Sequence, residues 1–251
     1  MRDATLAGAA VCVCVCVVPA CDSSFACGSG ATEGTGAPAD DSTEPRPPEA
    51  LVHPPDRDYR APEEFFVELD TRAGPVPIKV FREWAPNAAD RFYTLVELGY
   101  YDGVVFHRVV PYVLAQAGLH GHPAVNRAWR GRSIQEDPAR EGPTRGLISL
   151  VASQDGSLTT QFVIQSGDEL PGGIGGAPFG RIYDMRPVDR LSSDYGDDGE
   201  PSDLSERRLA AEGNAYIRES FPALDSVLAS RVVGRDRGGD DADDEVDESE
   251  D

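Results

Sequence analysis

Three polar side chains in two apolar segments of the chain are candidates for chemistry. Arg108 and Gln116 lie within residues 104–118, and Gln161 begins the later segment QFVI. A guanidinium and two carboxamides supply hydrogen-bond donors and one positive charge, but no nucleophile. Such side chains can bind and polarise a carbonyl group by hydrogen bonding and charge. Taken singly, an Arg in a strand more often forms a surface salt bridge, and a Gln more often lies on a solvated edge.

The sequence excludes several other kinds of catalytic site. All five cysteines precede the predicted fold: Cys12, Cys14, Cys16, Cys21 and Cys27. A disulfide framework or a zinc site within the fold is therefore excluded. His120 and His122 have no evident third ligand, so we expect solvent-exposed histidines in a loop and not a metal site. The glycines at 172–176 do not form a phosphate-binding loop. We expect neither a metal nor a cofactor.

The charge of the chain is uneven and strongly acidic. The net charge is -21, and residues 240–251 carry nine carboxylates without a base. Such a run repels itself, so residues 235–251 are expected to form a disordered, solvated tail. A cation-binding or partner-binding tail is the alternative. The acidity argues against nucleic acid as a partner, because phosphate contacts need clustered Lys and Arg.

Residues 1–21 have the features of an export segment. The apolar run at 4–20 is too short for a membrane span and fits the apolar part of a secretory signal. It ends in Val-Pro-Ala-Cys, which resembles the processing box of bacterial lipoproteins with Cys21 as the lipidated residue. Ordinary cleavage after Ala20 is the alternative, and Cys21 could then pair with Cys27. Both interpretations predict export to the cell envelope: lipid-anchored on the periplasmic face, or soluble in the periplasm or secreted.

The segment at residues 22–63 is expected to be a disordered linker. It is rich in Gly, Ala, Ser, Thr, Pro and acidic residues, and its few apolar residues cannot form a core. A lipid-anchored protein needs such a tether to hold its domain away from the bilayer. The folded domain is predicted at residues 64–234, including a C-terminal helical extension.

The predicted domain opens with a hairpin and a helix. Apolar runs at 65–69 and 76–81 flank a turn and predict two paired strands. Apolar residues at helical spacing give residues 86–98 one buried face. Pro86 suits the start of this helix and Gly99 suits its end.

The rest of the domain is predicted to be mainly β. Four further strands are expected at 104–109, 147–151, 161–165 and 179–183, and Val232-Val233 is expected to close the sheet. Residues 187–191 and 203–222 favour helix, the latter with an interruption at Gly213. Many short strands with one early helix predict a closed β-barrel with helical caps.

Five short motifs carry a resemblance to a known family. In chain order they are Phe106-His107-Arg108, Gln116, GLIS from Gly146, TQFVI ending at Ile164, and Phe179-Gly180-Arg181. Over roughly residues 65–191 the chain resembles the cyclophilin family of peptidyl-prolyl isomerases. The resemblance implies a closed antiparallel eight-stranded barrel capped by helices, and a chemistry that needs no metal or cofactor.

The resemblance also implies roles for the three polar residues. The X-Pro bond rotates slowly because its barrier is about 18–20 kcal/mol, although its cis and trans forms differ by only about 0.5–1 kcal/mol. Arg108 takes the position of the family's catalytic arginine and would stabilise the rotated amide. Gln116 would position Arg108 and the substrate, and Gln161 would bind peptide backbone.

The proline pocket implied by the resemblance departs from the family pattern. Its lining would consist of Val113, Leu114, Phe162 and Val163. Valine replaces a family aromatic at 113 and at 163, and a glycine-rich loop at 170–177 replaces the far rim. We expect weaker substrate binding and a reduced rate. The sequence leaves open whether residues 214–233 pack over the pocket and supply a missing wall.

Two functions of different classes remain at this stage. The first is an exported isomerase, expected to be monomeric, that acts on X-Pro bonds of exported proteins and assists their folding. The second is a cyclophilin-fold module that binds proline-containing polypeptides with little or no turnover. In both cases a lipid anchor would be the only link to a membrane.

Overall fold

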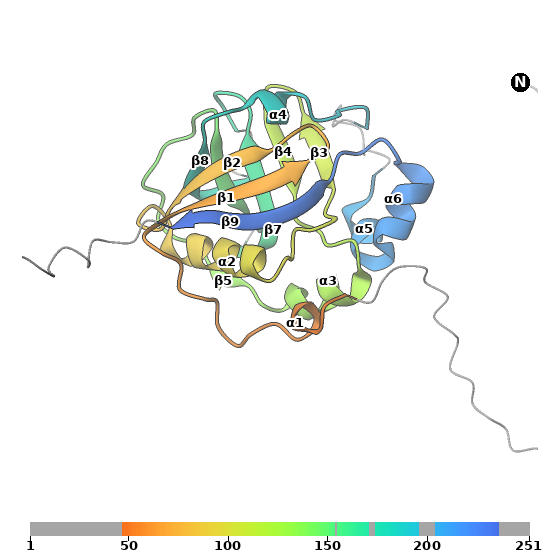
Figure 1. Ribbon diagram of the computed structural model, residues 1–251, viewed down its shortest axis with the longest axis horizontal. Helices are drawn as coiled ribbons and strands as arrows, with labels where there is room; N and C mark the ends of the chain where they lie inside the picture. Colours follow the sequence, from red (N-terminus) through yellow and green to blue (C-terminus); the bar gives the residue numbers. More distant parts are fainter. Residues whose placement is uncertain (1–46, 154, 171–173, 196–203, 236–251) are drawn as a thin grey trace, which may run out of the picture. The chain divides into compact units, whose positions relative to one another are not determined.

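The computed structural model describes residues 47–153, 155–170, 174–195 and 204–235 (Figure 1). The export segment, lipidation at Cys21, most of the linker and nearly all of the acidic tail lie outside the described residues. Within those ranges, no helix has the length and apolar character that crossing a membrane requires.

One antiparallel sheet dominates the described part of the chain. Eight of its strands follow the spatial order β3-β4-β7-β6-β8-β2-β1-β9, and β5 adds to β7. The strands are β1 Glu64–Thr71, β2 Val76–Phe81, β3 Phe106–Val110, β4 Leu114–Ala117, β5 Ile134–Gln135, β6 Leu147–Ala152, β7 Ser157–Gln165, β8 Gly175–Ile182 and β9 Val227–Arg235. They curl around a common core (Figure 1).

The two ends of this path meet near the start of β3 and β9. Val105 forms an isolated antiparallel bridge with Ser226, and the Val227 amide donates to the Val104 carbonyl at 2.8 Å. The barrel is therefore closed by a short backbone contact and not by a full strand ladder. The predicted mainly β, eight-stranded antiparallel barrel is confirmed, and β2 has the predicted bounds.

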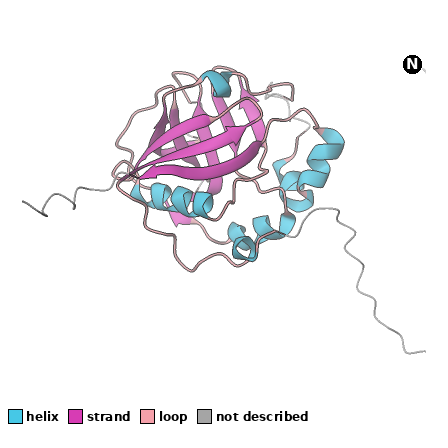
Figure 2. Cartoon of the chain, in the orientation of Figure 1, coloured by secondary structure: helices cyan, strands magenta, loops and turns pink. Residues whose placement is uncertain are grey.

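Helices lie around the outside of the sheet (Figure 2). They are α1 Glu49–Val52, α2 Pro86–Glu97, α3 Pro123–Arg130, α4 Arg186–Asp189, α5 Glu206–Glu212 and α6 Asn214–Ser220. The predicted first helix is α2, and the predicted helical extension is split at Gly213. The φ of Gly213 is 65°, a left-handed conformation that favours glycine. Neither α1 nor α3 was predicted.

Aromatic rings fill the barrel interior. Phe162 lies at its centre, with ring centroids 5.1 Å from Tyr101, 6.1 Å from Phe106 and 6.3 Å from Phe92. Phe92 comes from α2, Phe106 from β3 and Phe162 from β7, so the helix and these two strands share one core. Edge-on contacts of this kind add to the stabilisation from apolar burial.

The segment before β1 packs against the domain instead of forming a free linker. Leu51 of α1 is 1% exposed, and its carbonyl accepts a hydrogen bond from Trp129 Nε1 at 3.0 Å. Asp58 pairs with the buried guanidinium of Arg91 at 2.9 Å. The expectation of a disordered linker over residues 22–63 is therefore wrong for residues 47–63. The prediction failed because it considered only the apolar residues of the segment itself, whereas the segment packs on apolar surface that the domain supplies.

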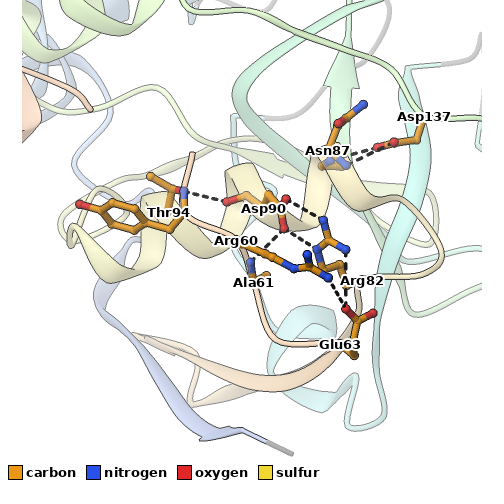
Figure 3. Close-up of polar contacts among 10 residues, drawn as sticks. Arg60, Ala61, Glu63, Arg82, Asn87, Asp90, Thr94 and Asp137 are labelled. Carbon is orange, nitrogen blue, oxygen red and sulfur yellow. Dashed lines mark hydrogen bonds and ion pairs between the residues drawn. The ribbon is translucent and has the colours of Figure 1, made fainter. Parts of the chain in front are cut away.

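Polar contacts join the end of this segment to α2 (Figure 3). The Ala61 amide donates to Asp90 Oδ1 at 2.9 Å, and Arg82 Nε donates to the same oxygen at 2.8 Å. The Tyr59 amide donates to Thr94 Oγ1 at 2.7 Å. Asp90 thus holds the chain before β1 and after β2, which fixes the first hairpin against the helix.

The start of α2 is capped from a distant part of the chain (Figure 3). Its N-cap residue Ala85 has no side chain that accepts a hydrogen bond. The carboxylate of Asp137 accepts from the amides of Asn87 at 3.2 Å and Ala88 at 3.0 Å. Free amides at a helix start need such acceptors, so this contact ties the loop before β6 to α2.

Candidate functional site

Strand pairing brings the predicted polar residues onto neighbouring strands. Arg108 of β3 lies opposite Gln116 of β4, which lies opposite Val163 of β7, which lies opposite Ser149 of β6. Residues directly opposite each other in an antiparallel sheet project from the same face. The structure therefore gathers Arg108, Gln116, Val163 and Ser149 on one face across four strands.

This face is the outer face of the barrel wall. Ala115, Ala117 and Phe162, which alternate with the site residues along β4 and β7, belong to the barrel core. Side chains of a strand alternate between its two faces, so Gln116 and Val163 project away from that core. The site is thus built on a wall whose inner side is fully packed, which limits its movement.

Gln116 is the central hydrogen-bonding residue of the site. It is 4% exposed, and its Nε2 donates to Gln161 Oε1 at 2.9 Å. The same nitrogen donates a longer bond of 3.4 Å to Glu206 Oε1. Gln116 Oε1 has no hydrogen-bond partner among the described residues. A buried carbonyl oxygen is costly to leave unpaired, so this oxygen is available to a donor from Arg108 or from a ligand.

Glu206 is a site residue that sequence reasoning missed. It is the first residue of α5, and its Oε1 also lies 3.5 Å from His107 Nε2. The imidazole of His107 and the charge of Arg108 hold the pKa of the Glu206 carboxyl below its usual range, against the opposing effect of partial burial. The sequence carries a signal for the helix start at Ser205-Glu206, but none for its contact with β3 and β4. Through Glu206, α5 reaches the polar face.

The predicted pocket residues do not form one wall. Leu114 and Val163 are each 1% exposed on the site face, and Val113 is half-buried. Phe162 is 0% exposed and packs among the core aromatics. Its assignment to the pocket is therefore corrected: strand alternation turns it to the inner face, away from its neighbours Gln161 and Val163.

Val163 is covered by the backbone at Gly175, which belongs to the glycine-rich segment that stands in place of the far rim of the family's pocket. A methyl group placed on Gly175 would lie 3.1 Å from Val163 Cγ1, 3.1 Å from Leu170 Cδ2 and 2.4 Å from Ser149 Oγ. The backbone at Gly175 therefore lies directly against the site face, and Leu170 comes close to the same point. In this conformation Val163 offers little apolar surface to a ligand.

A small hollow adjoins the site on the side of Leu114. Its volume is about 90 Å³. Val110, Tyr112 and Leu114 border it on the β3–β4 hairpin, and Val188 and Leu191 border it from the region of α4. Of the predicted pocket residues, only Leu114 contributes to its lining. The hollow is therefore not the proline pocket that the sequence predicted.

The two histidines after β4 have structural roles. Nδ1 of His120 accepts from the His122 amide at 2.9 Å, and Nδ1 of His122 accepts from the Ala124 amide at the start of α3. His120 is 9% exposed, so the expectation of two solvent-exposed histidines is wrong for this residue. Burial, with a smaller effect of His122, lowers the pKa of His120 to about 4. Among the described residues, no group of three His, Cys, Asp or Glu side chains is placed to hold a metal ion.

Comparison with known proteins relates this arrangement to one family. The family model described as "Cyclophilin type peptidyl-prolyl cis-trans isomerase/CLD" matches residues 66–203. The peptidyl-prolyl cis-trans isomerase ppi1 of Schizosaccharomyces pombe is 50% identical over 52 residues, which are 21% of this chain and 34% of that protein. A peptidyl-prolyl cis-trans isomerase of Acinetobacter baylyi is 28% identical over 135 residues, covering 51% of this chain and 72% of that protein.

A further relative comes from the same family, and a solved structure shares the fold. Peptidyl-prolyl cis-trans isomerase-like 3 of Gibberella zeae is 31% identical over 106 residues, covering 39% of this chain and 64% of that protein. The chain thus covers 34% of the length of ppi1 and 64% of the length of the Gibberella zeae protein, which is less than two thirds of either. The crystal structure of a cyclophilin type isomerase of Cryptosporidium parvum superposes with a TM-score of 0.50 at 16% identity, covering 68% of this chain and 99% of that one. Glu206 lies beyond the residues that the family model matches.

Proposed function

Because the chain belongs to the cyclophilin-type peptidyl-prolyl cis-trans isomerase family, we propose that it catalyses rotation about X-Pro peptide bonds. One observation carries this proposal beyond family membership. Arg108 and Gln116 are direct cross-strand partners, and Gln116 donates to Gln161 at 2.9 Å. The set is therefore preassembled on a rigid wall, as electrostatic catalysis requires.

Arg108, held beside Gln116, interacts differently with the planar and the rotated form of the X-Pro amide. A planar X-Pro amide delocalises the nitrogen lone pair into the carbonyl, and rotation removes this resonance. Arg108, placed beside the prolyl group, favours the rotated amide because its positive charge opposes delocalisation and stabilises the localised lone pair. The fixed hydrogen bond from Gln116 to Gln161 keeps Gln116 next to Arg108, so no side chain has to reorganise during rotation.

The apolar side of the site supports weak binding of the proline ring. Val163 is almost fully buried beneath Gly175 and Leu170, and Leu114 is equally buried. Proline binding therefore requires the segment around Leu170 to move, and two valines then supply less contact area than aromatic side chains. Each lost aromatic contact weakens binding through the area that it no longer buries. We accordingly propose an isomerase of reduced activity.

The substrates that we propose are X-Pro bonds of exported proteins. The support comes from the sequence of residues 1–21, an apolar run that ends in Val-Pro-Ala-Cys at Cys21. With a lipid on Cys21 the protein would act at the periplasmic face of the cell envelope. Mass spectrometry of the mature N-terminus tests this: a diacylated Cys21 supports the anchor, and an N-terminus elsewhere contradicts it.

Side-chain NMR distinguishes isomerisation from binding alone. A peptide Ala-Ala-Pro-Ala is added to ¹⁵N-labelled protein while the side-chain amides of Gln116 and Gln161 are observed. The proposal predicts that both amides shift, and that exchange between the cis and trans peptide forms accelerates. Shifts without faster exchange would support the binding module instead. The absence of shifts at Gln116 and Gln161 would contradict both.

A further inference from the structure

The carboxylate of Glu206 lies inside the proposed site although its helix is not part of the stretch that matches the family. Its Oε1 is 3.4 Å from Gln116 Nε2 and 3.5 Å from His107 Nε2. An acidic residue in the first turn of a helix stabilises that helix without any such contacts. The approach to Gln116 and His107 is therefore a separate feature that helix stability does not explain.

Glu206 occupies a donor that a substrate carbonyl would use. The Gln116 amide nitrogen has two hydrogens, and its two acceptors in this structure are Gln161 Oε1 and Glu206 Oε1. The contact with Gln161 is the shorter by 0.5 Å, so Glu206 is the acceptor that a ligand displaces more easily. A peptide carbonyl that binds Gln116 must therefore compete with the carboxylate of Glu206.

Glu206 is held in place by a packed extension. Leu209, Tyr216 and Phe221 form a second apolar cluster together with Val105, the residue that precedes β3. The Asn214 amide donates to the Gly121 carbonyl at 2.7 Å, which joins the extension to the loop after β4. These contacts join α5 and α6 to the start of β3 and to the loop after β4, and Figure 1 shows the two helices beside this end of the sheet. This packing places the carboxylate of Glu206 at the site.

We propose that Glu206 selects the substrate, favouring prolyl peptides with a Lys or Arg close to the proline over those with an acidic residue there. Half of the Glu206 side chain remains exposed, so a substrate side chain can reach it. When a substrate carbonyl displaces Glu206 from Gln116, a substrate cation replaces the lost partner, whereas a substrate carboxylate is repelled. This selection rests on the proposed function of the same site.

The charges around the Glu206 carboxylate fit this role. His107 and Arg108 of β3 keep it ionised, and Gln161 of β7 contributes in the same direction. Arg208, two residues after Glu206 in α5, is paired with Glu212 at 2.9 Å. A carboxylate that stays charged and half exposed discriminates between substrate charges by direct attraction and repulsion.

The test compares three peptides on the full chain: Ala-Xaa-Pro-Ala with Xaa as Lys, Gln or Glu. Dissociation constants are measured by NMR titration and isomerisation rates by exchange spectroscopy on the same samples. We expect the Lys peptide to bind about fivefold more tightly than the Glu peptide, the effect typical of one partly exposed charge contact. In Glu206→Gln the three affinities should agree within about twofold, and in Glu206→Lys the order should invert.

Glu219→Gln is the matched control, because it removes the same charge from an exposed position of the neighbouring helix α6 and leaves the pair of Arg208 with Glu212 intact. It should keep the wild-type order of affinities. Equal affinities in the wild type, or an unchanged preference in Glu206→Gln, would overturn the proposal. If the charge preference is found but neither the wild type nor any variant accelerates cis–trans exchange of the peptides, the proposed isomerase function fails and the selection stands. If exchange accelerates equally for all three peptides, the selection fails and the isomerase stands.

Discussion

The buried imidazole of His120 makes the stability of the domain depend on pH. Its edge faces Tyr100 with ring centroids 5.3 Å apart, and its Nδ1 accepts the His122 amide. Burial lowers the pKa of His120 from 6.5 to about 4. The unfolded chain therefore takes up a proton below pH 6.5, where the folded protein does not. The stabilisation is complete above that pH and is lost as the pH falls toward 4.

The magnitude follows from the size of this pKa difference. Each unit of pKa corresponds to about 1.4 kcal/mol, so the free energy of unfolding should fall by about 2.5 kcal/mol from this group between pH 7.5 and pH 4.5. Other groups titrate over the same range, which makes a matched variant necessary. In His120→Asn the amide oxygen can still accept the His122 amide, but nothing titrates at that position.

Urea denaturation of both proteins at several pH values measures the effect. We expect the wild type to lose about 2.5 kcal/mol more than His120→Asn over this range. A constant difference between the two at every pH is the cost of losing the ring contact with Tyr100 and does not affect the argument. Parallel pH dependences would refute the reasoning, because they would mean that His120 is protonated equally in the folded and unfolded chains.

Two further predictions concern the segment before β1 and the cover over Val163. Leu51→Ala should lower the free energy of unfolding by about 2–3 kcal/mol, because Leu51 is 1% exposed in the core. Glu49→Ala, at an exposed position of the same helix, should change the free energy of unfolding little. Equal effects of the two variants in urea denaturation would mean that α1 does not pack on the domain. Leu170→Ala should uncover Val163 and thereby tighten the binding of prolyl peptides about threefold, as measured by NMR titration. Weaker binding in this variant would show instead that Leu170 contacts the substrate.

Local sequence patterns predicted those strands and helices whose apolar residues recur with strand or helix periodicity. The apolar alternation at 76–81 gave β2, and helical spacing with Pro86 and Gly99 at the ends gave α2. Gly213 interrupts the helical extension as predicted, because its φ of 65° is one that other residues avoid. In these cases the signal and the structure lie within the same few residues.

Features that depend on distant contacts were not predictable in this way. The segment at 47–63 is held by Trp129 and Arg91, and neither contact leaves a mark on the segment's own composition. The cap on α2 comes from Asp137, fifty residues after Asn87, from whose amide it accepts a hydrogen bond. Glu206 joins Gln116 across ninety residues, and the packing of the extension on Val105 and its hydrogen bond to Gly121 bring the two together.

The candidate site was predictable to the extent that motifs define it. Strand pairing places Arg108 opposite Gln116, the residue that the resemblance led us to expect beside it, whereas the hydrogen bond from Gln116 to Gln161 was not predicted. The pocket was less predictable, because the covering of Val163 depends on how Gly175 and Leu170 pack. The inward direction of Phe162 could have been found from strand alternation with Val163.

The most direct test of the proposed function is the rate of prolyl isomerisation with the full chain, measured by exchange spectroscopy on Ala-Ala-Pro-Ala. Arg108→Ala removes the proposed electrostatic catalyst, and Arg186→Ala is the matched control, since Arg186 is exposed and pairs with Asp184. We predict that the wild type and Arg186→Ala accelerate exchange, and that Arg108→Ala loses about tenfold or more of that acceleration. Equal rates in the wild type and Arg108→Ala would contradict a catalytic role for this site.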